Sequence, residues 1–150
     1  MKEKFDQLKE YYKDTNITIQ TDFSSNDTVY NADLMITDWS AIAYEYSFTT
    51  KKPVIFIDTP MKIMNPEYKK IKVEPFNIWS RDVMGKVIKL NELKNINVII
   101  KDMLNNTDKY TKKIDKLLND SVYNIGNSSE IGANYIIETI QDKIKERSKK

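Results

Sequence analysis

The fold of this chain is decided by residues 33–57, whose sequence is DLMITDWSAIAYEYSFTTKKPVIFI. Hydrophobic patterning divides the stretch into a buried strand over 33–37, a helix over 39–49 with Ile42 and Tyr46 on one face, and a strand over 53–57. The second strand is continuously apolar from Val54 onward, which is typical of a parallel strand covered on both faces. A strand–helix–strand unit predicts a right-handed crossover. We therefore expect an α/β fold with a small parallel sheet and flanking helices.

The rest of the chain carries weaker patterns. They predict helices over 3–13, 28–31, 92–104, 109–119 and about 128–146, and strands over 16–20 and 86–90. Asn91 and Asp108 are the expected N-caps of the third and fourth of these helices. Residues 58–84 contain three turn signals with proline, which predicts a long irregular segment between strands. A segment of this length in a compact domain often serves a function.

The composition excludes several classes of site. The 150 residues fit one domain, and they include no histidine and no cysteine. Disulfides and cysteine-ligated metals are therefore excluded, and a zinc site or a Ser-His-Asp triad within this chain is disfavoured. The net charge of +2 does not indicate a nucleic-acid partner. We expect no signal peptide and no transmembrane segment, because the longest continuous apolar run is four residues, and we expect a cytoplasmic location.

The turn from the first strand into the helix is the main candidate for a binding site. In open α/β sheets, ligands bind at the carboxyl edge of the strands, and the free N–H groups of a helix start can hold a phosphate. Thr37, Asp38, Trp39, Ser40 and Ala41 occupy this turn, where Ser40 adds a hydroxyl and Ala41 leaves the backbone accessible. Apart from Asp38, we expect no acidic side chain in the first helical turn. The alternative is an ordinary N-cap with no ligand.

Three further residues have both a binding and a structural interpretation. Glu45 lies seven positions after Asp38, so its carboxylate could accept hydrogen bonds from ribose hydroxyls or could simply face solvent. Trp39 and Trp79 could each stack on a nucleotide base or pack as partly buried aromatic residues. No glycine-rich dinucleotide or Walker motif is present, which disfavours oxidoreductases and P-loop kinases.

The stretch 32–46, ADLMITDWSAIAYEY, followed by KPVIF over 52–56, resembles the CDP-glycerol glycerophosphotransferase family of teichoic acid primases and polymerases. The family pattern is roughly A-D-x-L-I-T-D-Y-S-S-x-x-x-[DE]-[YF] and then K-P-x-x-[FY]. The segments at 85–87 and 127–130 are similar to further family segments, so the resemblance covers most of residues 28–140.

The resemblance implies a GT-B architecture, in which this chain is the C-terminal, Rossmann-like half that binds the donor nucleotide. Residues 1–150 would then be a single donor-binding domain from a larger two-domain enzyme. The pyrophosphate of a CDP donor would be lined by residues of the turn, with an acidic residue farther along the same helix; here these are Thr37, Asp38, Trp39, Ser40, Ala41 and Glu45. Two positions depart from the pattern: Trp39 replaces Tyr, and Ala41 replaces the second Ser.

The family's catalytic histidines have no counterpart here, so the isolated chain is expected to bind without catalysing. The implied reaction moves glycerol phosphate, or a similar polyol phosphate, from a CDP donor to a polymer or lipid-linked acceptor held through the missing half. No cofactor and no metal are expected, and the full-length protein would lie at the inner face of the membrane. Two rivals stay open: another GT-B transferase with a sugar-nucleotide donor, and a non-catalytic α/β binding module.

Overall fold

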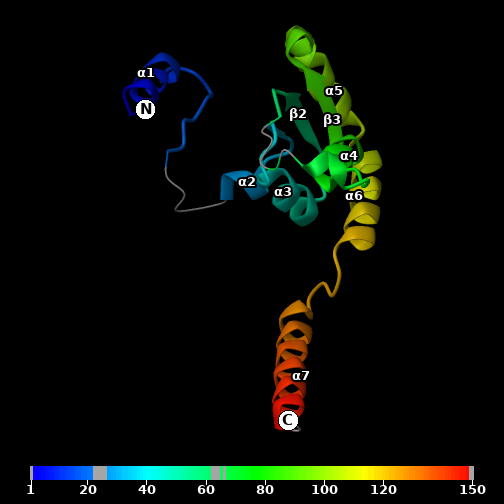
Figure 1. Ribbon diagram of the computed structural model, residues 1–150. Coiled ribbons are helices and arrows are strands. Elements are labelled where there is room, and N and C mark those ends of the chain that lie inside the picture. Colours follow the sequence, from blue (N-terminus) through cyan, green and yellow to red (C-terminus); the bar gives the residue numbers. More distant parts are fainter. Residues whose placement is uncertain (1, 22–26, 62–64, 66, 149–150) are drawn as a thin grey trace. The chain divides into compact units, whose positions relative to one another are not determined.

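The computed structural model describes residues 2–21, 27–61, 65 and 67–148 (Figure 1). The chain divides into two compact units, Met1–Ala32 and Asp33–Lys150. The first unit holds helices α1 (Lys2–Tyr12) and α2 (Asp27–Asn31), as the patterns over 3–13 and 28–31 predicted. All three described strands lie in the second unit.

The second unit is built on a parallel sheet in the order β1-β2-β3. The strands are β1 (Met35–Thr37), β2 (Val54–Asp58) and β3 (Gly85–Lys89). Met35 of β1 is in register with Val54, and Val54 is in register with Gly85 of β3. The sheet with its flanking helices confirms the predicted α/β, Rossmann-like fold class.

Helical elements connect and follow these strands. They are α3 (Ile42–Thr50), η1 (Tyr68–Lys70), α4 (Phe76–Met84), η2 (Leu90–Asn95), α5 (Ile96–Asn105), α6 (Thr107–Ser121) and α7 (Ser128–Ser148), where η marks a 3-10 helix. Helix α4 contacts both β3 and α6, and α3 also contacts α6. Helix α4, which lies between β2 and β3 in the chain, therefore attaches the sheet to helix α6.

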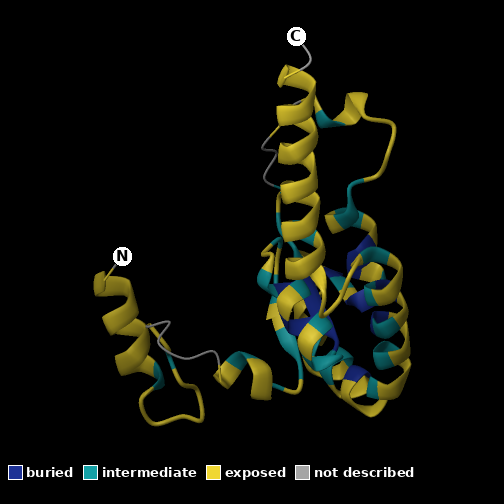
Figure 2. Cartoon of the chain, turned by 90° about the horizontal axis from the view of Figure 1, so that it is seen from below, coloured by how far each residue is buried: buried dark blue, intermediate teal, exposed yellow. Residues whose placement is uncertain are grey.

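The core of the second unit forms around β2. Val54, Ile55 and Phe56 are at most 1% exposed, so both faces of this strand are covered as its apolar sequence predicted. On one face, Ile55 packs with Ile88 of β3 and Met103 of α5. Figure 2 shows the buried residues gathered in the sheet and its nearby helices, whereas α1 and α7 carry none.

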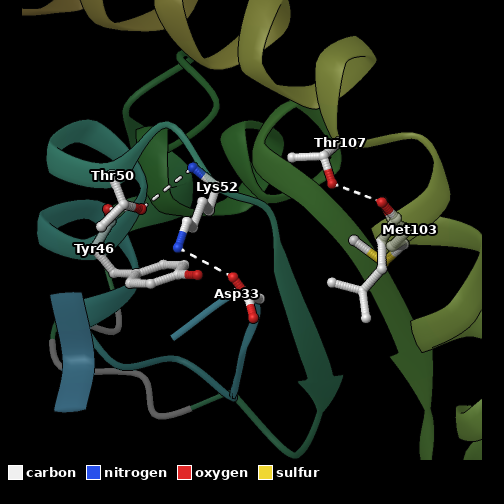
Figure 3. Close-up of polar contacts among 7 residues, drawn as sticks. Asp33, Tyr46, Thr50, Lys52, Met103 and Thr107 are labelled. Carbon is white, nitrogen blue, oxygen red and sulfur yellow. Dashed lines mark hydrogen bonds and ion pairs between the residues drawn. The ribbon is translucent and has the colours of Figure 1, made fainter. Parts of the chain in front are cut away.

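The turn from α3 into β2 is fixed by several hydrogen bonds (Figure 3). The hydroxyl of Thr50 accepts a hydrogen bond from the N–H of Lys52 at 3.2 Å, and the Lys52 ammonium lies 3.3 Å from the carboxylate of Asp33. Lys51 adopts a left-handed conformation with φ of 60°, and its carbonyl accepts a hydrogen bond from Thr111 of α6. Burial beside this turn raises the pKa of Tyr46 to about 12. The turn thus fixes the start of β2 against α6.

Two predictions about strands are wrong. Residues 16–20 form no strand, and Ile17 there is 51% exposed, because the first unit contains no other described strand with which to pair. The strand predicted over 33–37 exists as β1, but it is not buried: Ile36 is 47% exposed. Among the described strands β1 pairs only with β2, so it lies at an edge of the sheet.

The predicted helix boundaries also need correction. Helix α3 begins at Ile42 and not at residue 39, because residues 38–41 form a turn. The segment over 58–84 is not irregular throughout, since α4 begins directly after Pro75. The helix over 92–104 is split into η2 and α5, so Asn91 is not its cap. The N-cap of α6 is Asn106 and not Asp108.

Substitution of Gly85 tests the packing of the sheet. A Cβ at Gly85 would lie 1.7 Å from the carbonyl oxygen of Val54, so Gly85→Ala must push β3 away from β2. We expect it to lower the free energy of unfolding by about 1–3 kcal/mol or more, measured by urea denaturation. Gly132→Ala is the control, because a Cβ there meets nothing within 4 Å. Equal stability of the two variants would contradict the close contact.

Candidate functional site

A pocket of about 410 Å³ lies where β1 and β2 end. It is lined by residues of the β1–α3 turn, of the segment after β2 and of the first turn of α4: Asp38, Trp39, Ser40, Thr59, Pro60, Met61 and Asn77. Because the strands are parallel, their carboxyl ends bring the first two of these segments to the same edge of the sheet. The pocket therefore occupies the edge at which open α/β sheets bind ligands.

Trp39 joins the three walls of this pocket. Its indole Nε1 donates a hydrogen bond to the carbonyl oxygen of Thr59 at 2.9 Å. The guanidinium of Arg81, on α4, lies 3.5 Å from the centre of the Trp39 ring. The hydroxyl of Thr59 lies 3.4 Å from a carboxylate oxygen of Asp38, to which it donates a weak hydrogen bond. The turn before α3 is thus held to the end of β2 and to α4.

Arg81 is the most deeply buried charged residue of the described chain. It is 6% exposed, and its Nη2 lies 3.3 Å from the carboxylate of Asp58. Its Nε and Nη1 are buried and have no hydrogen-bond partner among the described residues. Arg81 lines a small recess of about 10 Å³ together with Tyr44, Phe56 and four residues that also line the larger pocket. A positive charge with unused donors therefore lies beside the pocket.

Tyr44, which lines the recess, and Ser80 connect α3 to α4. Their hydroxyl oxygens lie 3.1 Å apart, and Ser80 also donates to the carbonyl oxygen of Phe76. Burial raises the pKa of the Tyr44 hydroxyl, while the hydrogen bond with Ser80 and the charge of Arg81 lower it. The Tyr44 ring packs against the ring of Phe76, with centroids 5.4 Å apart. These contacts fix the spacing of the two helices that border the site.

A family model described as CDP-glycerol:poly(glycerophosphate) glycerophosphotransferase matches residues 1–138. The chain belongs to this family. No curated protein and no solved structure matched the chain. No helix in the described ranges is long and apolar enough to cross a membrane.

The glycerophosphotransferase resemblance implied six site residues, and the structure brings three of them together. Asp38, Trp39 and Ser40 line the pocket. Thr37, which ends β1, Ala41 and Glu45 are not among its lining residues. Glu45 is exposed and lies in the first turn of α3, so the expectation of an acid-free first turn is wrong. It fails because α3 begins three residues later than the sequence predicted.

The N-cap interpretation of the turn is also wrong. The N-cap of α3 is Ala41, and no side chain makes a capping hydrogen bond there. Asp38 receives its hydrogen bond from Thr59, and Ser40 is exposed at the pocket wall. Ala43 and Tyr44 already donate their N–H groups to backbone carbonyls, so the N–H groups available to a ligand are those that precede Ala43.

Sequence patterns did not predict the contributions of β2 and α4 to this site. Thr59, Asn77 and Arg81 all fall in the segment that was predicted to be irregular. A signal was present: Pro75 is followed by Phe76, Trp79 and Val83 at helical spacing, which is the pattern of a helix that begins after a proline. The pairing of Arg81 with Trp39 carries no local signal, because 42 positions separate the two residues.

The indole hydrogen bond makes a testable contribution to stability. Trp39→Phe removes the donor to Thr59 and should lower the free energy of unfolding by about 0.5–1.5 kcal/mol beyond the loss of ring area. Trp79→Phe is the matched control, because no described residue accepts a hydrogen bond from its indole and its side chain is 38% exposed. Urea denaturation followed by circular dichroism compares the two variants. A loss at Trp79 as large as that at Trp39 would show that the hydrogen bond contributes nothing.

Proposed function

We propose that this chain binds the CDP-activated donor of a polyol-phosphate transferase, with the donor diphosphate against the turn between β1 and α3. The observation that carries the proposal is the pocket formed by Asp38, Trp39 and Ser40 at the carboxyl edge of the sheet, in a chain of the glycerophosphotransferase family. The chain would serve as the C-terminal half of a GT-B enzyme, peripheral at the inner face of the membrane. The acceptor would be a growing teichoic-acid-type polymer held through the other half.

The turn offers several groups that suit a diphosphate. The backbone N–H groups before Ala43 carry the partial positive charge of the helix start. The Ser40 hydroxyl does not cap the helix and is free to donate to a phosphate oxygen. The negative carboxylate of Asp38 repels an anion, and the hydrogen bond that it accepts from Thr59 partly offsets this repulsion. Thr37, Ala41 and Glu45 would lie outside the diphosphate contacts, where Glu45 could accept hydrogen bonds from ribose hydroxyls.

The proposed reaction transfers the polyol phosphate to an acceptor hydroxyl. The acceptor oxygen attacks the phosphorus of glycerol phosphate, the phosphoanhydride bond breaks, and CMP leaves with the bonding electron pair. The hydroxyl proton needs a base, for which the family uses histidine, and this sequence has none. The chain's own part would be to hold the donor and to stabilise the charge that develops on CMP through the helix start.

The other candidates share the fold and differ in the ligand. A sugar-nucleotide transferase would use the same diphosphate contacts but a different base and sugar. A non-catalytic module is favoured by the absence of histidine and by Ala41, which removes one hydroxyl of the family pattern. Titration with CDP, UDP and GDP separates the first two candidates, and failure of all three to bind supports the module.

Substitutions at Ser40 test the diphosphate position. Ser40→Ala should weaken CDP binding by only about 1 kcal/mol, because the backbone donors remain. Ser40→Asp should weaken it more, since it places a negative charge beside the phosphates. An acid near a helix start is favourable to the helix dipole, so the melting temperature of Ser40→Asp should stay equal or rise.

Calorimetric titration with CDP beside thermal melting measures both effects. Ser129→Asp is the matched control, because it adds the same charge to the first turn of α7, a helix that does not line the pocket. Its CDP affinity should equal that of the parent chain. If Ser40→Asp also binds CDP as the parent does, the diphosphate does not lie at this turn.

The absence of histidine predicts that the isolated chain is inactive. Incubated with CDP-glycerol and a glycerophosphate-primed acceptor, the 150-residue chain should release no CMP above the uncatalysed background. Chromatographic detection of CMP measures this, and the same mixture with a complete enzyme of the family is the positive control. CMP release by this chain would overturn the division of binding and catalysis between two halves.

A further inference from the structure

We propose that Arg81 binds an anion in the pocket and that its unpaired guanidinium donors hold phosphate oxygens of the donor diphosphate. This inference rests on the proposed function, because it assigns a residue to the same diphosphate. Neither the β1–α3 turn nor the family pattern points to Arg81, which lies on α4 and enters the site only through the fold.

The burial of Arg81 is the first argument. Its guanidinium is a cation, and the residue is only 6% exposed. A buried charge is costly unless it is paired and its donors are satisfied. Among the described residues, only the Nη2 of Arg81 has an acceptor, the carboxylate of Asp58 at 3.3 Å. The remaining donors, Nε and Nη1, are buried and would be satisfied by a ligand that carries acceptor oxygens.

The orientation of the guanidinium is the second argument. The Trp39 ring lies 3.5 Å from the guanidinium carbon and the Phe56 ring lies 5.8 Å from it. The two aromatic residues and Asp58 hold the planar group in place before any ligand arrives, so binding would cost little additional side-chain entropy. A guanidinium fixed in this way is suited to phosphate, whose oxygens match its donors.

The position of Arg81 relative to the pocket is the third argument. The recess that Arg81 lines has a volume of about 10 Å³, which admits roughly one water-sized atom. Four of its lining residues, Asp38, Trp39, Ser40 and Asn77, also line the 410 Å³ pocket. A diphosphate in the larger pocket could therefore place one oxygen in the recess, beside Arg81. Ser40, in the β1–α3 turn, would contact the same diphosphate from the other side of the recess.

The rival explanation is structural. Arg81 could serve only to stack on Trp39 and to pair with Asp58, so that its removal would alter stability without altering affinity. The two explanations predict different affinities for inorganic pyrophosphate and CDP when Arg81 is substituted. Pyrophosphate tests the anion site alone, whereas CDP tests the nucleotide as well.

The experiment titrates the full 150-residue chain with pyrophosphate and with CDP by calorimetry. Arg81→Met and Arg81→Lys are compared with Arg147→Met and Arg147→Lys, which change the chain's other arginine, an exposed residue of α7. We expect Arg81→Met to weaken both ligands at least tenfold, and Arg81→Lys to weaken them less, because Lys keeps the charge but loses the fork. The Arg147 variants should bind as the parent chain does.

A second variant keeps the test decisive if Arg81→Met does not fold. Asp58→Asn leaves Arg81 intact and removes its counter-charge from a position that is 40% exposed. Pyrophosphate affinity should then rise about two- to fivefold, since an acceptor that competes for the guanidinium is weakened.

Fluorescence gives a second readout of binding. In a Trp79→Phe background Trp39 is the chain's only tryptophan, so its fluorescence reports directly on occupancy of the site beside Arg81.

The outcomes separate this inference from the proposed function. CDP affinity that is unchanged in the foldable Arg81 variants and in Asp58→Asn overturns the role of Arg81 and leaves the donor proposal standing. Arg81-dependent pyrophosphate binding with no tighter binding of CDP supports the anion site and overturns the CDP donor. A parent chain that binds neither ligand overturns both.

Discussion

Strand β2 is buried on both faces and paired along both edges, and the rest of the second unit is arranged around it. Its apolar residues exclude water from the sheet, while its neighbours β1 and β3 satisfy its backbone hydrogen bonds. The close approach of Gly85 to Val54 sets the distance between β2 and β3. Because all three strands run in parallel, their carboxyl ends lie at the same edge of the sheet. A shift of β2 would expose its buried residues to water, so its packing fixes the position of the edge at which the site lies.

The polar residues at the end of β2 contact the residues that form the site. Asp58 is the last residue of β2 and Thr59 follows it, and they contact Arg81 and Trp39 respectively. Arg81 stacks on Trp39, so a single cation–aromatic pair joins α4 to the turn before α3. Trp39 is therefore the residue that holds the walls of the pocket together. Its ring covers the guanidinium, and its indole nitrogen reaches the end of β2.

The parts of the fold that the sequence predicted are those with a strong local signal. Residues 54–57 are continuously apolar, and Ile114 and Leu117 repeat at helical spacing with Tyr110; the structure places both groups in or against the core. Residues 16–20 show that alternation alone does not make a strand, since an isolated extended segment has no partner for its hydrogen bonds. For the site, the turn was predictable because a strand and a helix meet there. Arg81 was not, because its environment comes from β2 and the β1–α3 turn, which are distant in sequence.

The walls of the pocket come from three segments that adjoin only when the chain is folded. Any ligand held by Trp39, Thr59 and Arg81 together will therefore bind the native state and not the unfolded state. At a concentration one hundred times its Kd, such a ligand adds about 2.7 kcal/mol to the free energy of unfolding. That amount is a large part of the stability of a typical domain. The lifetime of this protein in a cell would then follow the supply of its ligand, with depletion leaving a larger fraction of unfolded chains open to proteolysis.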